Sequence, residues 1–163
     1  MVDQDTAPSR HMLTSAAFGT VEVSASAIME FTAPLWGFED KTSYALLPAA
    51  RDGLFWLQST DDEVTTFILA DPFAIDAAYG FELSDAEKSA LGVQTPEEVL
   101  TLVMVTLPTG QSTDVTANFR GPLVFNVRTG RAMQLVTTNE AHDIRRPIDL
   151  ATFPRREDGV KLL

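Results

Sequence analysis

Short apolar runs, many alternating with polar residues at a period of two, recur along this chain roughly every ten residues, as expected for half-buried strands. Segments rich in Gly, Asp and Pro separate them. Strands are expected at residues 18–24, 27–31, 43–49, 54–59, 64–70, 79–83, 112–119, 122–127 and 131–136. The pattern predicts a mainly β fold: a single antiparallel β-barrel-like or sandwich domain.

Helix signals are confined to two places. Ser84 and Glu87 form a capping box before "DAEKSALG", and Gly92 supplies a C-terminal stop. A second capping box at residues 95–98 has room for barely one turn, because the apolar run "VLTLVMVTL" follows at residues 99–107. That run favours a central buried strand, although periodicity alone leaves a buried helix open. We therefore expect one or two short helices.

The chain length fits one domain, and its two ends differ from the middle. Residues 1–16 are polar and predict a flexible N-terminal arm. Residues 17–150 carry the strand pattern and form the predicted barrel domain. Residues 151–163 are basic, without periodicity, and predict an extended or frayed C-terminal tail.

Charge is unevenly distributed along the sequence. The net charge is −11, and residues 1–118 carry 18 acidic against four basic side chains, whereas residues 119–163 carry five against eight. One interpretation is a surface that keeps the protein soluble, with a basic tail. The other is an acidic face that steers a basic protein partner during encounter. Direct binding of nucleic acid is not expected, because phosphates need clustered Lys and Arg.

Residues for catalysis or metal binding are sparse. The absence of cysteine excludes disulfides, thiol catalysis and cysteine-based zinc sites. His11 and His142 have no third metal ligand at a recognisable spacing, and phosphate-loop, nucleophile-elbow and zinc-protease motifs are absent. We expect no catalytic residue, metal or cofactor. A small-ligand-binding barrel, or a cryptic hydrolase with His142 beside Asp143 as its base, remains the alternative.

The N-terminus lacks the apolar core of a signal peptide, and the longest apolar run is far shorter than a membrane span. The sequence thus predicts a cytoplasmic protein that makes no membrane contact.

Several aromatic residues lie in predicted loops, beside prolines and glycines. They are Trp36, Phe38, Phe73 and Tyr79. Two interpretations stay open: the rings plug the ends of a barrel, or they form an exposed apolar patch that binds a protein.

Five stretches together resemble the flagellar assembly factor FliW family. They are Phe31, Leu35, Gly37 and Phe38 in one loop; "FWLQS" at 55–59; "FILADPF" at 67–73 with Tyr79 following; "TANFRGPLVFN" at 116–126; and "GRAMQL" at 130–135. Pro34 and Trp36 depart from the usual family loop, where a glycine and a proline stand.

The resemblance implies a β-barrel-like fold and a role without catalysis. Members of this family bind CsrA, a basic RNA-binding translational repressor, and bind flagellin, and the two partners trade places. The family-like motifs suggest partner contacts at Phe38, Asp71, Pro72, Phe73, Tyr79, Asn118 and Asn126. For the two asparagines, local capping of the backbone is the competing interpretation. Direct and allosteric antagonism of CsrA both remain open.

Overall fold

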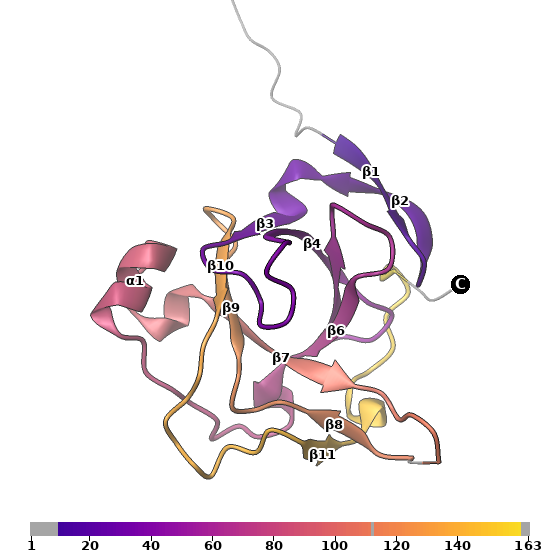
Figure 1. Ribbon diagram of the computed structural model, residues 1–163. Coiled ribbons are helices and arrows are strands. Elements are labelled where there is room, and N and C mark those ends of the chain that lie inside the picture. The colour runs from indigo at the N-terminus through magenta and orange to yellow at the C-terminus, as the bar shows by residue number, and fades with distance from the viewer. Residues whose placement is uncertain (1–9, 112, 161–163) are drawn as a thin grey trace, which may run out of the picture.

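Seven strands close into a barrel, because the strand Leu100–Thr106 pairs with Thr66–Ala70 and also with Leu123–Asn126. The computed structural model describes residues 10–111 and 113–160 (Figure 1). Its strands are β1 (Arg10–Ser15), β2 (Gly19–Ser24), β3 (Ile28–Phe31), β4 (Ser43–Pro48), β5 (Leu54–Ser59), β6 (Thr66–Ala70), β7 (Leu100–Thr106), β8 (Val115–Ala117), β9 (Leu123–Asn126), β10 (Arg131–Gln134) and β11 (Arg146–Ile148).

The ring runs in the order β7, β6, β5, β4, β3, β10, β9 and back to β7. All of its pairings are antiparallel except β10 with β3, which is parallel. Strand β9 pairs with the first part of β7, and β8 pairs with its last two residues. Strand β11 extends the sheet beyond β8. The predicted antiparallel β-barrel is confirmed, with one parallel closure.

Alternate residues of the ring strands fill the barrel interior. Each strand contributes side chains from one face only, as the period-two geometry requires. This cluster consists of Met29, Phe31, Leu35, Tyr44, Leu46, Leu57, Leu69, Leu102, Leu123, Phe125 and Ala132. The barrel is therefore filled by side chains.

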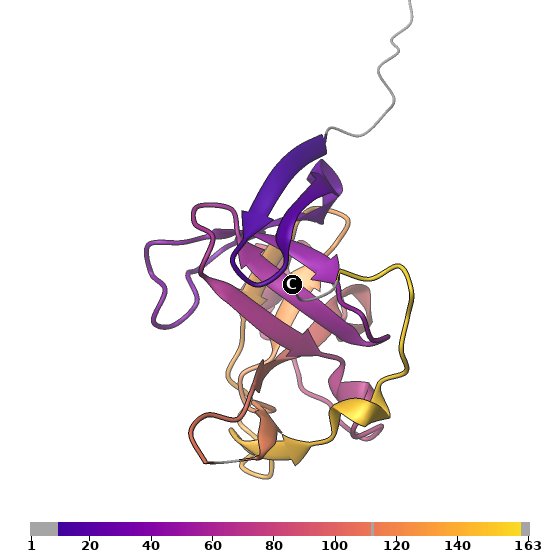
Figure 2. The same cartoon turned by 90° about the vertical axis from the view of Figure 1, so that its right-hand side faces the viewer.

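A second apolar cluster covers the outside of β4 to β7. Trp56 and Leu47 belong to it, together with Phe18 from the β1–β2 hairpin and Phe153 from the C-terminal segment. The hairpin and that segment lie on the outside of the strands (Figures 1 and 2). Because both faces of these strands are covered, the run at 99–107 is apolar on both sides, and its prediction as a buried strand is confirmed by β7.

The predicted helix after Ser84 is confirmed as α1 (Asp85–Leu91), with both hydrogen bonds of the capping box formed. Gly92 ends it in the left-handed conformation at φ 74°, which favours glycine. Leu91 packs with Val124 and Leu135 on the outside of β9 and β10. The second capping box forms a single 3₁₀ turn (Pro96–Glu98), and three further 3₁₀ turns are Ala25–Ala27, Pro72–Ala74 and Leu150–Thr152.

The prediction of a flexible arm is wrong for residues 10–15, which form β1 and pair with β2 over its whole length. Leu13 of β1 is buried in the outer cluster, and that burial holds the hairpin on the barrel. The polar composition hid this strand, because only one of its faces is apolar. Residues 1–9 lie outside the described residues.

The prediction of a frayed tail is wrong for residues 151–160. Phe153 is buried, and the indole Nε1 of Trp56 donates a hydrogen bond of 3.0 Å to the carbonyl of Val160. A Cβ on Gly159 would stand 1.7 Å from the carbonyl oxygen of Ala49, so only glycine fits there. Residues 161–163 lie outside the described residues.

Two predicted strands are also corrected. Residues 79–83 form no ladder, although their burial alternates as in a strand. The strand expected at 112–119 is shorter, because β8 spans only Val115–Ala117; residue 112 lies outside the described residues.

Candidate protein-binding surface

The loop between β3 and β4, residues 32–42, folds into one mouth of the barrel (Figure 1). Leu35 is 1% exposed and packs in the interior cluster. The half-buried Phe38 packs edge-on against Phe67, with ring centroids 4.9 Å apart. Trp36 is 60% exposed. Phe38 therefore plugs the mouth, as one of the two interpretations of the loop aromatics predicts, whereas the indole of Trp36 lies at the surface.

Carboxylates from two loops gather at this mouth. The Nζ of Lys41 lies 2.9 Å from Asp40 Oδ2 and 3.3 Å from Asp62 Oδ2, which joins the loop 32–42 to the loop 60–65. The two loops carry five acidic residues against this one lysine: Glu39, Asp40, Asp61, Asp62 and Glu63. The surface here is strongly negative.

Asp62 also organises its own loop. Its Oδ1 accepts hydrogen bonds from the amides of Thr65 and Val64, at 2.7 and 2.8 Å. These bonds, that of Thr65 first, lower the pKa of Asp62 to about 2, so the carboxylate is charged at neutral pH. Val64 beside it is 77% exposed. A rigid acidic loop thus presents an apolar side chain.

The segment Asp71–Tyr79 follows the other end of β6. Asp71 caps the 3₁₀ turn by accepting a hydrogen bond from the amide of Phe73 at 2.9 Å, and Pro72 is buried. Tyr79 is buried and donates to the carbonyl of Phe119 at 2.7 Å. Phe73 is 44% exposed and contacts the Tyr79 ring. Of these four predicted contacts, Phe73 therefore offers the apolar surface, and Pro72 and Tyr79 support it from below.

The predicted contacts Asn118 and Asn126 bind the chain's own backbone. Asn118 Oδ1 accepts from the amides two and three residues further on, both at 3.0 Å. Asn126 is 2% exposed; its Nδ2 donates to the carbonyl of Leu91 at 2.8 Å, and its Oδ1 accepts from the amide of Arg128 at 3.1 Å. Asn118 shapes the turn into β9, and Asn126 holds the C-terminal end of α1.

The seven candidate residues thus occupy three separate places. Phe38 lies at one barrel mouth, the stretch Asp71–Tyr79 with Asn118 lies near Phe119, and Asn126 lies under α1. The structure does not gather them into one surface.

His142 is engaged on both sides. Its Nδ1 lies 2.8 Å from Thr137 Oγ1, and its ring packs on Tyr79 with centroids 4.8 Å apart. Asp143 contacts the core through its backbone carbonyl, which accepts from Phe119. Within residues 10–111 and 113–160, no carboxylate hydrogen-bonds to His142. The arrangement is not that of a Ser–His–Asp triad.

Arg146 of β11 fastens this region. Its guanidinium lies 3.0 Å from Asp76 Oδ2 and 4.8 Å from the centre of the Phe119 ring. The hydrogen bond from Arg146, with that from the amide of Ala78, lowers the pKa of Asp76. The ion pair ties the loop after β6 to the last strand.

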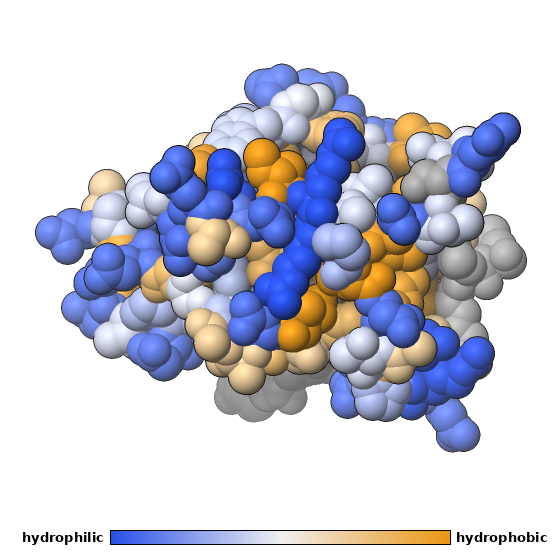
Figure 3. Space-filling view, turned by 90° about the horizontal axis from the view of Figure 1, so that it is seen from below, coloured by the Kyte–Doolittle hydropathy of each residue, from blue (hydrophilic) through white to orange (hydrophobic). Residues whose placement is uncertain are grey.

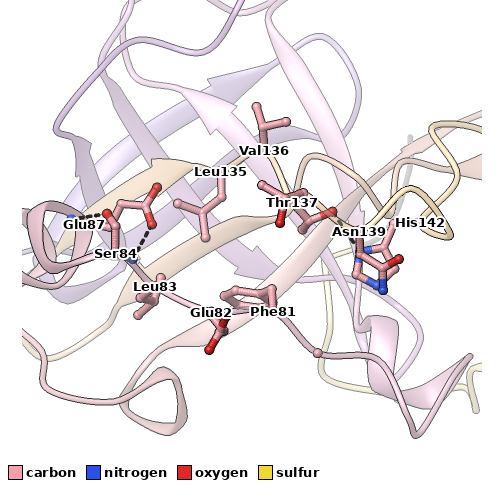
Figure 4. Close-up of a pocket in the computed structure, with 12 residues that line it drawn as sticks. Phe81, Glu82, Leu83, Ser84, Glu87, Leu135, Val136, Thr137, Asn139 and His142 are labelled. Atoms are coloured by element: carbon pink, nitrogen blue, oxygen red, sulfur yellow. Dashed lines mark hydrogen bonds between the residues drawn. The ribbon is translucent and has the colours of Figure 1, made fainter.

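A groove of about 560 Å³ opens beside this cluster, outside the barrel. Residues 80–84 line one side of it and residues 135–139 the other, with His142 at one end (Figure 4). Sequence reasoning missed this groove. The signal in the sequence is the alternating segment 79–83, which predicts a short strand.

Apolar side chains reach the surface at several points. On the face that carries β8 and β11, they lie among strongly hydrophilic ones (Figure 3). The large exposed apolar side chains of the described residues are Met12, Trp36, Val64, Phe73, Leu107, Val127, Val136 and Ile144. Such side chains on an acidic protein suit protein contacts.

In the part of the chain that the structure describes, no group of three or more His, Asp or Glu side chains is placed to hold a metal ion. No helix in that part combines the length and the apolar character needed to cross a membrane.

Comparison with known proteins identifies the relatives of this chain. Residues 12–148 match the model of the FliW protein family. A flagellar assembly factor FliW of Treponema denticola is 34% identical over 139 residues, which are 83% of this chain and 94% of the relative. That of Leptospira biflexa is 33% identical over 132 residues, covering 80% and 86%. That of Syntrophus aciditrophicus is 34% identical over 134 residues, covering 82% and 84%.

The fold agrees with these relatives. A crystal structure of the flagellar assembly factor FliW superposes with a TM-score of 0.74, covering 84% of this chain and 96% of that one, at 24% identity. The resemblance predicted from five short motifs is confirmed, and this chain belongs to the FliW family of flagellar assembly factors.

Proposed function

We propose that this FliW-family protein is a non-enzymatic, partner-switching regulator of flagellar assembly. It binds the basic translational repressor CsrA and antagonises it, and it binds flagellin; the two partners exchange on it. Membership of the FliW family over residues 12–148 carries this proposal.

The charge of the molecule supports a basic partner. Residues 1–118 hold 18 of the 23 acidic side chains, and the loops at one barrel mouth add the exposed Trp36 and Val64 to their carboxylates. Negative charge speeds encounter with a positive partner, and an exposed indole supplies apolar area that is buried once the partner docks. An acidic rim around apolar anchors fits a protein such as CsrA.

The interior supports a role without catalysis. Buried side chains such as Leu57, Leu102 and Phe125 fill the barrel, so its lumen offers no room for a small ligand. His142 has Thr137 and Tyr79 as its contacts, and within the described residues no carboxylate hydrogen-bonds to its imidazole, so the orienting third member of a hydrolase triad is missing there.

Isothermal titration calorimetry of the purified protein tests the proposal. We expect saturable binding to CsrA and, separately, to flagellin. CsrA binding should weaken as salt is raised above about 0.1 M, where the Debye length is roughly 10 Å. Flagellin added to the CsrA complex should release CsrA. Absence of binding to both partners would refute the proposal.

A further titration separates the two modes of antagonism. RNA is added to CsrA before this protein is titrated in. If the RNA only raises the apparent dissociation constant between CsrA and this protein, RNA and this protein share one site on CsrA. A stable complex of all three indicates two coupled sites.

A further inference from the structure

Residues 80–83 have the form of a strand without a partner. Tyr79 and Leu83 are buried, Phe81 is half-buried, and Gly80 and Glu82 are exposed, which is the alternation of an extended segment with one face on the core. Within the described residues, the backbone of residues 80–83 neither donates nor accepts a hydrogen bond. Its peptide groups are therefore available to a partner.

A second open backbone edge lies on the other side of the groove. Beyond β10, Leu135 donates from its amide to the carbonyl of Pro122, and Thr137 donates to that of Arg120, both at 2.8 Å. Along an extended strand, the amides of successive residues point to opposite edges. The amide of Val136 therefore points away from residues 120–122, and among the described residues it has no acceptor.

The groove of about 560 Å³ lies between these two edges. Leu83 and Leu135 belong to one buried cluster and form its floor. In Figure 4, Phe81 to Ser84 run along one side and Leu135 to Thr137 along the other. Ligand clefts in proteins have volumes of about 300–1,000 Å³, so a short extended segment fits between the edges.

The negative charge of the groove favours a basic ligand. Glu82 and Glu87 line it, and no Lys or Arg does. Glu82 is exposed and makes no ion pair with any described residue. Glu87 accepts a hydrogen bond from the amide of Ser84, which holds its carboxyl group beside the groove. A segment with a lysine or arginine is complementary to this rim.

We propose that the groove between residues 80–84 and 135–139 binds an extended segment of a protein partner by strand addition. The segment pairs with the free backbone edge at Val136, places an apolar side chain over Leu83 and Leu135, and sets a basic side chain near Glu82. This inference rests on the proposed function, within which the basic segment belongs to CsrA.

A proline substitution tests the backbone contact. Val136→Pro removes an amide that has no acceptor within the described chain, so the fold should be retained, as thermal unfolding will show. Binding to CsrA, measured by calorimetry, should weaken about tenfold or more. Val136→Ala keeps the amide and should bind within about twofold of the unchanged protein.

A charge reversal tests the rim. Glu82→Lys should weaken CsrA binding by about tenfold, whereas Glu22→Lys should not, because Glu22 is an exposed residue of the β1–β2 hairpin, away from the groove. Hydrogen exchange gives a second measurement without mutation: CsrA should protect the amide of Val136.

The outcomes are distinct. Unchanged CsrA binding by Val136→Pro, with no protection of this amide, overturns the groove assignment and leaves the proposed function standing. Loss of flagellin binding alone overturns the assignment to the basic partner. If the unchanged protein binds neither partner, the proposed function fails and the groove assignment with it.

Discussion

The hydroxyl of Tyr79 donates a hydrogen bond of 2.7 Å to the carbonyl of Phe119, and the two rings pack edge to face with centroids 5.2 Å apart. This contact ties the loop after β6 to the "TANFRGPLVFN" stretch, 40 positions further along the chain. Burial raises the pKa of Tyr79, so the hydroxyl remains a donor at any pH at which the protein is handled.

Tyr79→Phe should lower the free energy of unfolding by about 1–3 kcal/mol, because the buried carbonyl of Phe119 loses its donor. Urea denaturation at neutral pH measures the change. A change below about 0.5 kcal/mol would show that the carbonyl finds another donor at no cost.

The second tyrosine of the chain is a matched control with the opposite expectation. Tyr44 is fully buried, and its hydroxyl has no hydrogen-bond partner among the described residues. Tyr44→Phe should therefore raise stability, by about 1 kcal/mol, since it removes an unsatisfied polar group. A loss of stability in the same urea experiment would contradict this reading of the barrel interior.

Asp62 should make the stability of the folded protein depend on pH in the acid range. Its pKa is lowered from 3.8 to about 2 in the folded protein, so its contribution is fully present above pH 3.8 and is lost as the pH falls through about 2. In Asp62→Asn, thermal unfolding followed from pH 5 down to about 2 should fall less steeply than in the unchanged protein. An identical slope would show that the carboxylate is not linked to folding. Asp61→Asn, at an exposed neighbour in the same loop, is the control.

Leu35 and Trp36 are adjacent and should respond oppositely. Leu35→Ala should destabilise the protein by about 2–5 kcal/mol, because it leaves a cavity at the barrel mouth. Trp36→Ala should change stability by less than about 0.5 kcal/mol, yet weaken binding to CsrA by about 2 kcal/mol if the indole is an anchor. Denaturation and calorimetry on both variants give the comparison. Unchanged binding by Trp36→Ala would remove this loop from the interface.

The sequence predicted well those elements that are determined by residues close together in the chain. The capping box at Ser84 and Glu87 needs only the side chains within one turn, and α1 begins and ends where those residues place it. The double-sided apolar run predicted β7 for the same reason. Apolar residues at successive positions of this run indicate that both faces of the strand are buried.

The elements that sequence missed depend on distant partners. β1 is stabilised by pairing and by the burial of Leu13 against residues far along the chain, and the C-terminal segment by the bond between Trp56 and Val160. For residues 79–83 the failure was the reverse: the strand pattern is present and the chain supplies no ladder for it. The alternation of apolar and polar residues predicts which face of a strand is buried. It does not predict whether another strand pairs with its edge.

The candidate contact residues also could be predicted only in part, because their surroundings depend on distant parts of the chain. Asn118 and Asn126 stood in a motif of the family, and the structure assigns their hydrogen bonds to the protein's own turns. Exposure distinguishes Trp36 from Phe38, and sequence alone could not, since both are aromatic residues beside Gly37. Whether these residues contact a partner stays a prediction.

The parallel pairing of β10 with β3 also has a kinetic consequence. It joins Arg131 to Glu30, about 100 positions apart, whereas β4, β5 and β6 are linked by short turns. Closing a long loop costs chain entropy before any contact compensates for it, so the meander should form early and this seam late. On the ribosome, residues 28–70 emerge long before β10, so the backbone edge of β3 that pairs with β10 stays unpaired until the final third of the protein has been synthesised.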